Sequence, residues 1–103
     1  MICFLVPVKS KKLSSDWTKF SKLVDRSLKS INGQKDRDFQ IVVACHELPE
    51  SNFQHPQVHY IQVNFDPPKL TNSDWEKDRQ IKEGDKARKI WSAYEYANKN
   101  FEV

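Results

Sequence analysis

Three residues with chemically useful side chains follow one apolar segment of the sequence. Cys45, His46 and Glu47 come directly after the run QIVVA, which has the length and β-branched composition of a buried strand. A thiol beside an imidazole can act as a nucleophile with its base. Adjacent residues on a strand point to opposite faces, however, so Cys45 and His46 are poorly placed for that pairing. We therefore expect a buried thiol at Cys45, and hydrogen-bonding groups at the rim of a pocket at His46 and Glu47.

Two other kinds of site find little support in the sequence. A structural zinc site needs four ligands in close pairs. The chain has two cysteines, and the interval between His55 and His59 contains a proline. Neither GxGxxG nor GxxxxGK[ST] occurs, so a glycine-rich phosphate loop is not expected. We expect no metal within this chain, and any bound phosphate must be met by side chains or a helix N-terminus.

A basic cluster near the end of the chain is the second candidate site. Lys86 and Arg88 follow Gly84 and Asp85, where we expect one helix to end and another to begin. Cations at a helix N-terminus oppose the macrodipole unless an anion lies close by. The cluster therefore suggests a phosphate site, and a solvated charged turn is the alternative.

The apolar pattern predicts the elements that position these residues. Strands are expected over 2–8, 39–44 and 58–63. A first helix should start after an N-cap among residues 14–16 and end at Gly33. Its expected buried face is Trp17, Phe20, Val24, Ser27 or Leu28, and Ile31.

The sequence after the third strand predicts two further helices. Ser73 and Glu76 have the spacing of a capping box and should open a short helix. We expect a break at Gly84 and a last helix over 86–100. The apolar face expected for this last helix is Ala87, Ile90, Trp91, Tyr94, Ala97 and Phe101.

Length and element order indicate the fold class. At 103 residues the chain has room for one domain. Apolar strands that alternate with amphipathic helices predict an α/β fold, Rossmann-like in layout, with a mostly parallel sheet and flanking helices. The strand ends at 7–10, 45–47 and 64–66 should then meet at one edge of the sheet, where open α/β sheets bind ligands.

Charge and cysteine use bear on partners and compartment. The 17 basic and 14 acidic residues are mixed along the chain, and Lys9, Lys11 and Lys12 form the only dense basic run. A nucleic-acid interface is therefore not expected, although RNA binding through these three lysines is a third, weaker alternative. The apolar N-terminal run is too short to cross a membrane. Free thiols suit a reducing compartment, so we expect a cytoplasmic protein.

The segments "RSLKSINGQ" and "DFQIVVACHE", after a first strand that ends in Pro-Val, resemble the start of family-2 glycosyltransferases of the GT-A fold. The later "DKARKIWSAYEYA" is similar to that family's next helix. The positions that carry the resemblance are Pro7, Val8, Leu28, Ser30, Ile31, Gln34, Asp38, Phe39, Ile41, Val42 and Val43.

The resemblance implies the nucleotide-binding half of such an enzyme, with a nucleotide-diphospho-sugar, UDP-sugar in particular, as ligand. Pro7, Val8 and Lys9 would line the base pocket. His46, at the second position of the family's acidic pair, and Glu47, one place after the pair, would stand beside it. Lys86 and Arg88 would meet the diphosphate.

The sequence departs from the family in two respects. Cys45 and His46 occupy the positions of the two family aspartates. The family's Asp-x-Asp, which holds Mn²⁺ or Mg²⁺, would follow a strand that opens at 101–103, so we expect a chain truncated before that motif. Transfer would then need a metal and base from another segment, and whether the chain is an enzyme stays open. A non-enzymatic module that binds a nucleotide or a protein is the alternative.

A sheet of three strands leaves unpaired backbone at its edges and apolar surface near them. We therefore expect a homodimer or larger assembly that forms through a sheet edge or the last helix.

Overall fold

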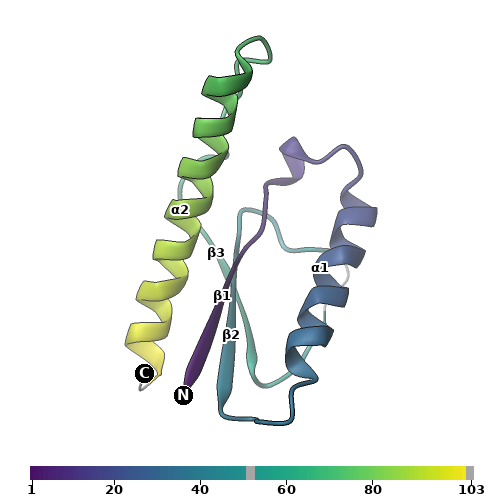
Figure 1. Cartoon of the computed structure of the whole chain (residues 1–103), viewed down its shortest axis with the longest axis vertical. Coiled ribbons are helices and arrows are strands. Elements are labelled where there is room, and N and C mark those ends of the chain that lie inside the picture. Colours follow the sequence, from purple (N-terminus) through teal and green to yellow (C-terminus); the bar gives the residue numbers. More distant parts are fainter. Residues whose placement is uncertain (51–52, 102–103) are drawn as a thin grey trace.

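Three parallel strands form one sheet, with a long helix on each face (Figure 1). The computed structural model describes residues 1–50 and 53–101. The elements along the chain are β1 (Ile2–Pro7), the single 3-10 turn η1 (Lys11–Leu13), α1 (Trp17–Asn32), β2 (Phe39–Cys45), β3 (Val58–Gln62) and α2 (Trp75–Asn100). The predicted α/β class with a parallel sheet is confirmed, and the predicted strand bounds agree with the structure to within one residue at each end.

The central strand, β2, is the most deeply buried element. Its last five residues have no exposed surface, because β1 and β3 pair with its two edges and helices cover its two faces. Parallel sheets are covered in this way, and such strands are apolar along their whole length. The apolar sequence of residues 2–8 predicts a strand buried on both faces, and this prediction was wrong. β1 lies at an edge of the sheet, and its residues from Cys3 to Pro7 are half-buried.

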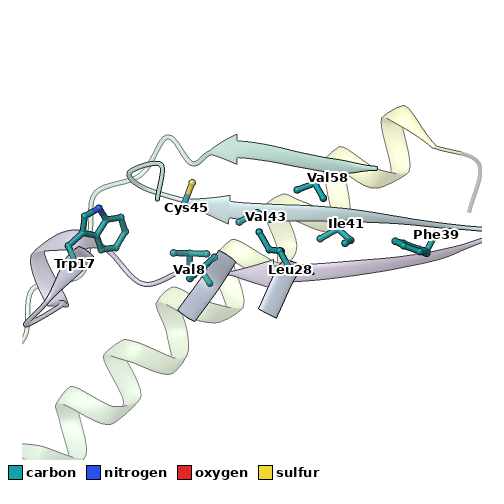
Figure 2. Packing of buried hydrophobic residues seen from close by; sticks show 9 residues of the cluster. Val8, Trp17, Leu28, Phe39, Ile41, Val43, Cys45 and Val58 are labelled. Atoms are coloured by element: carbon teal, nitrogen blue, oxygen red, sulfur yellow. The ribbon is translucent and has the colours of Figure 1, made fainter. Parts of the chain in front are cut away.

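Helix α1 packs against one face of the sheet and forms the larger core with it (Figure 2). The Asp16 side chain caps its first turn by accepting a hydrogen bond from the Lys19 amide, 3.0 Å away. Trp17, Val24 and Leu28 are buried in this core, as the sequence predicted, and Phe20 and Ile31 pack at its margin.

Helix α2 is a single helix of 26 residues, which corrects two predictions. Asp74, rather than Ser73, caps its start, and the chain does not break at Gly84. A glycine inside a helix costs only about 1 kcal/mol relative to alanine. The residues around Gly84 are good helix formers, and an ion pair from Asp85 to Lys89 spans the next turn. The helix therefore continues through the glycine.

The face that α2 turns to the sheet differs in part from the prediction, which was right for Ala97 and Phe101 but wrong for Trp91 and Tyr94. Lys89, Ala93 and Ala97 are buried, whereas Trp91 is 61% exposed and Tyr94 50% exposed. The two alanines pack on Val42 and Ala44 of β2 and its neighbours in a second, smaller core. Small side chains let a helix approach a sheet closely, and this contact decides how the helix is rotated.

The N-terminal half of α2 extends past the carboxyl ends of the strands (Figure 1). At its other end, the Phe101 amide donates to the Ala97 carbonyl and closes the helix. The strand expected to open at 101–103 lies largely outside the described residues. No helix in the described part of the chain is both long and apolar enough to span a membrane.

Replacing Gly84 by alanine tests the continuity of α2. A Cβ at Gly84 would have no heavy atom within 4 Å, so the substitution meets no steric obstacle. We expect the free energy of unfolding of Gly84→Ala to rise by about 0.5–1 kcal/mol, measured by urea denaturation. A loss of stability would mean that the chain turns at Gly84, as the sequence had predicted.

Candidate functional site at the carboxyl ends of the strands

The three strand ends meet at one edge of the sheet, as predicted. The Ser10 hydroxyl after β1 donates to Glu47 after β2, at 3.2 Å to Oε1. The His46 ring meets the ring of Phe65 edge-on, with 5.2 Å between centroids. Parallel strands place their carboxyl ends together, and these two contacts hold the three connecting segments against one another.

A cleft of about 370 Å³ lies at this edge, between the end of β1 and the projecting half of α2. Its volume is within the range of small-molecule sites. It is lined by Pro7, Val8, Lys9, Leu13, Phe20, Lys82, Asp85, Lys86 and Lys89. Among these residues, four lysines face a single carboxylate. The cleft therefore combines an apolar wall with an excess of positive charge, which suits an anionic ligand that carries a ring.

The deepest charged group in the cleft is Lys89. Its side chain is 1% exposed, and Nζ lies 2.6 Å from Oδ2 of Asp85, which is itself 9% exposed. A buried ammonium group needs such a partner, because removing an unpaired charge from water is costly. An ammonium has three donors and Asp85 takes one of them. An anionic group in the cleft can accept from the others.

His46 lies behind Asp85 rather than at the rim of the cleft. Its side chain is 5% exposed, and Nε2 is 3.9 Å from Oδ1 of Asp85, too far for a hydrogen bond. Within the described residues neither ring nitrogen makes a hydrogen bond of normal geometry. Burial, followed by the charge of Lys89, lowers the pKa of His46, although Asp85, Glu47 and the nearby backbone of Asp66 act in the opposite direction. The ring is therefore neutral near pH 7.

Glu47 holds the turn after β1. Its carboxylate accepts from the Ser10 hydroxyl and, at 3.1 Å, from the Lys11 amide. Ser10 is fully buried, and its hydroxyl also accepts from the Lys12 amide at 3.2 Å. This network positions the segment that carries Lys9 into the cleft. Glu47 thus supports the cleft wall and is not among the residues that line it.

The two residues of the predicted basic cluster, Lys86 and Arg88, have different surroundings. Lys86 lines the cleft, whereas the Arg88 guanidinium stacks on Phe65, 3.9 Å from the ring centroid. Both residues lie in the middle of α2, so the prediction that they stand beside free N–H groups at a helix N-terminus was wrong. An anion at Lys86 must rely on the lysine side chains alone.

Cys45 is a core residue, as expected. It is fully buried on the α1 side of the sheet, and its thiol lies 3.5 Å from the Ile61 carbonyl. Burial, with the Glu47 carboxylate in second place, raises the pKa of Cys45 to about 11, against the opposing effect of Lys89. The residue is a thiol at neutral pH, which does not suit a nucleophile.

The residues of the cleft do not fit a divalent cation. Mg²⁺ and Mn²⁺ prefer several oxygen ligands. Asp85 is the one carboxylate among the described lining residues, and it is already paired with Lys89. Elsewhere in the described ranges, no three His, Cys, Asp or Glu side chains gather as a metal site.

Comparison with known proteins adds no constraint on this site. No protein-family model, curated protein or solved structure matches the chain.

The structure thus brings Pro7, Val8, Lys9 and Lys86 together and adds Lys82, Asp85 and Lys89 to them. Lys82 was missed because the predicted helix break at Gly84 separated it from Lys86, whereas Asp85 and Lys89 stand in the charged segment of the sequence but were not assigned to the site. Their spacing, 82-85-86-89, is one face of a continuous helix. This spacing can be seen in the sequence once the helix is taken to continue across Gly84.

The buried ion pair can be tested by removing one or both partners. Lys89→Met leaves the Asp85 charge without its cation, and we expect a loss of about 3–5 kcal/mol in the free energy of unfolding. The double variant Asp85→Leu/Lys89→Met should recover most of this loss. The exposed pair of Arg79 and Glu83 is a matched control, since Arg79→Met should cost less than about 1 kcal/mol. Equal losses of stability in Lys89→Met and Arg79→Met would contradict the burial of the Asp85–Lys89 pair.

The histidines predict a pH dependence of stability. Burial lowers the pKa of both His46 and His59 in the folded chain. Below an unfolded pKa of about 6.5, the unfolded chain then binds more protons than the folded one. The free energy of unfolding should fall as the pH drops through 6.5 toward the lowered values. Urea titrations across this range should show a smaller fall in His46→Gln/His59→Gln, and an equal fall in both proteins would exclude this cause.

Proposed function

We propose that this protein binds a nucleotide-diphospho-sugar, a UDP-sugar in particular, in the cleft between β1 and α2. The observation that carries the proposal is the pairing of four lysines with an apolar wall in one cleft at the carboxyl ends of parallel strands. A nucleoside diphosphate has matching parts, a flat base and two charged phosphates. The resemblance of the strand and helix segments to family-2 glycosyltransferases supports the same ligand class.

The wall formed by Val8, Leu13 and Phe20 suits the base. The Lys9 ammonium lies over the Phe20 ring, 4.5 Å from its centroid. Such a contact is worth only about 0.5–1 kcal/mol at an exposed site, less than a charge-assisted hydrogen bond to phosphate. An incoming diphosphate would therefore draw Lys9 off the ring and leave the aromatic face free for the base.

The opposite wall, on α2, suits the diphosphate. Lys82, Lys86 and Lys89 lie on one face of the helix, and Lys89 is held in place by Asp85. Asp85 and Lys89 form a rigid floor, whereas Lys82 and Lys86 are exposed and free to adjust. The proposal concerns binding alone, because the cleft residues supply neither the family's metal motif nor its base.

An NMR titration of labelled protein tests the proposal, with UDP, UDP-glucose, uridine and inorganic diphosphate as probes. Saturable shifts with UDP and UDP-glucose should centre on Val8, Lys9, Phe20 and Lys86, and uridine or diphosphate alone should bind more weakly. Lys86→Gln should weaken UDP binding about tenfold, the effect of losing about 1.4 kcal/mol.

Lys99→Gln is the matched control for this titration. It removes the same charge from the far end of α2, about 15 Å along the helix from Lys89, and should leave the affinity almost unchanged. Absence of shifts at millimolar UDP would overturn the proposal. Equal weakening by Lys86→Gln and Lys99→Gln would show attraction by net charge only.

A further inference from the structure

The outer edge of β1 is unpaired within the described residues. The Ile2 amide donates to Asp38 and the Val8 amide to Ala44, so the even-numbered residues of β1 bond toward β2. Backbone groups alternate in direction along a strand, and those of Cys3 and Leu5 therefore point to the open edge. Pro7 has no amide hydrogen, which limits this edge to two outward donors.

Beside this edge lies an exposed apolar surface on α2, which we call the α2 strip: Ala87, Ile90, Trp91 and Tyr94. These residues follow the i, i+3, i+4, i+7 spacing of a packing face, yet Trp91 is 61% and Tyr94 50% exposed. Together with Leu5 they line a groove of about 340 Å³. The α2 strip contains no charged residue, and it is not the side of α2 that faces the sheet.

Because of where α2 lies, the open β1 edge and the α2 strip can both take part in one symmetric contact between two copies. The helix packs over both β1 and β2 to a similar extent, which puts its axis near the boundary between these strands. If two β1 edges pair at about 4.8 Å, the two α2 axes come to lie about 10 Å apart on the same face of the joined sheet. Packed helices are separated by 8–10 Å. Edge pairing and helix packing are therefore satisfied together.

We propose that two copies of this chain form a dimer by antiparallel pairing of their β1 edges, with the α2 strips packed against each other. Cys3 of one copy lies opposite Leu5 of the second copy, and Phe4 lies on the two-fold axis. This register uses all the outward groups of Cys3 and Leu5 in four hydrogen bonds. It joins the two sheets into one of six strands and leaves the nucleotide cleft outside the interface.

The two exposed aromatic residues supply part of the area that a dimer interface needs. Trp91 and Tyr94 together expose roughly 250 Å² in each copy, from typical aromatic areas and the exposed fractions above. That is about a third of the roughly 800 Å² per partner of a standard interface. Leu5, Ala87, Ile90 and the backbone edge of β1 lie next to it and supply further area.

Sedimentation equilibrium of the full chain tests the dimer. The wild-type protein should dimerise at micromolar concentration, and Trp91→Glu should raise the dissociation constant about 30-fold or more, as for a central aromatic anchor. Trp75→Glu is the matched control, because Trp75 is 77% exposed but lies at the distant start of α2. It should leave the dissociation constant unchanged. A wild-type monomer at high micromolar concentration, or equal effects of both variants, would overturn the proposal.

A cross-link tests the register. Residues opposite each other in a hydrogen-bonded antiparallel pair have Cα atoms about 5.5 Å apart, which a disulfide can span. In Leu5→Cys, the thiol introduced at position 5 should form a disulfide with Cys3 of the second copy, seen as a covalent dimer on a non-reducing gel. The double variant Leu5→Cys/Cys3→Ser should form none. A covalent dimer in both variants, or in neither, would overturn this register.

Discussion

The complete burial of β2 is the constraint on which the rest of the structure depends. A parallel strand in the centre of a sheet has its backbone groups paired on both edges, and its side chains must be covered on both faces. Helix α1 covers one face with large apolar side chains, and α2 covers the other with two alanines. The chain thus packs a three-layer domain around one seven-residue strand.

The alanine contact has consequences for the rest of α2. Because Ala93 and Ala97 must face β2, the next residue on the same side one turn earlier, Lys89, is carried into the interior. The ammonium is tolerated there because Asp85 lies one further turn back on the helix and neutralises it. The same rotation turns Trp91 and Tyr94 outward. The buried ion pair and the exposed aromatic strip therefore have one origin, the close approach of a small-residue helix face to the sheet.

The length of α2 and the short loop after β1 together create the cleft. The helix continues beyond the strand ends, and Glu47 ties the β1 loop to the end of β2. Two surfaces that are distant in sequence, 7–20 and 82–89, then face each other. The cleft and the exposed strip lie on different parts of α2, so a ligand and a second copy of the chain would not compete for one surface.

The sequence by itself determined the strands, the start and end of α1, the parallel direction of the strands and the convergence of their carboxyl ends. These features follow from local signals, namely apolar runs of strand length, an N-cap among residues 14–16 and the alternation of strands with helices. It also indicated correctly that Cys45 is buried.

Only the tertiary structure decided the course and rotation of α2, and with them the composition of the cleft. The local penalty at Gly84 is small enough for packing elsewhere in the helix to override it. The apolar pattern favoured Trp91 and Tyr94 as the buried face because larger side chains gain more from burial. Alanines face the sheet instead, because a helix can approach a flat, fully paired strand closely only where its side chains are small. This close packing therefore decides which lysines of α2 line the cleft together with Lys9.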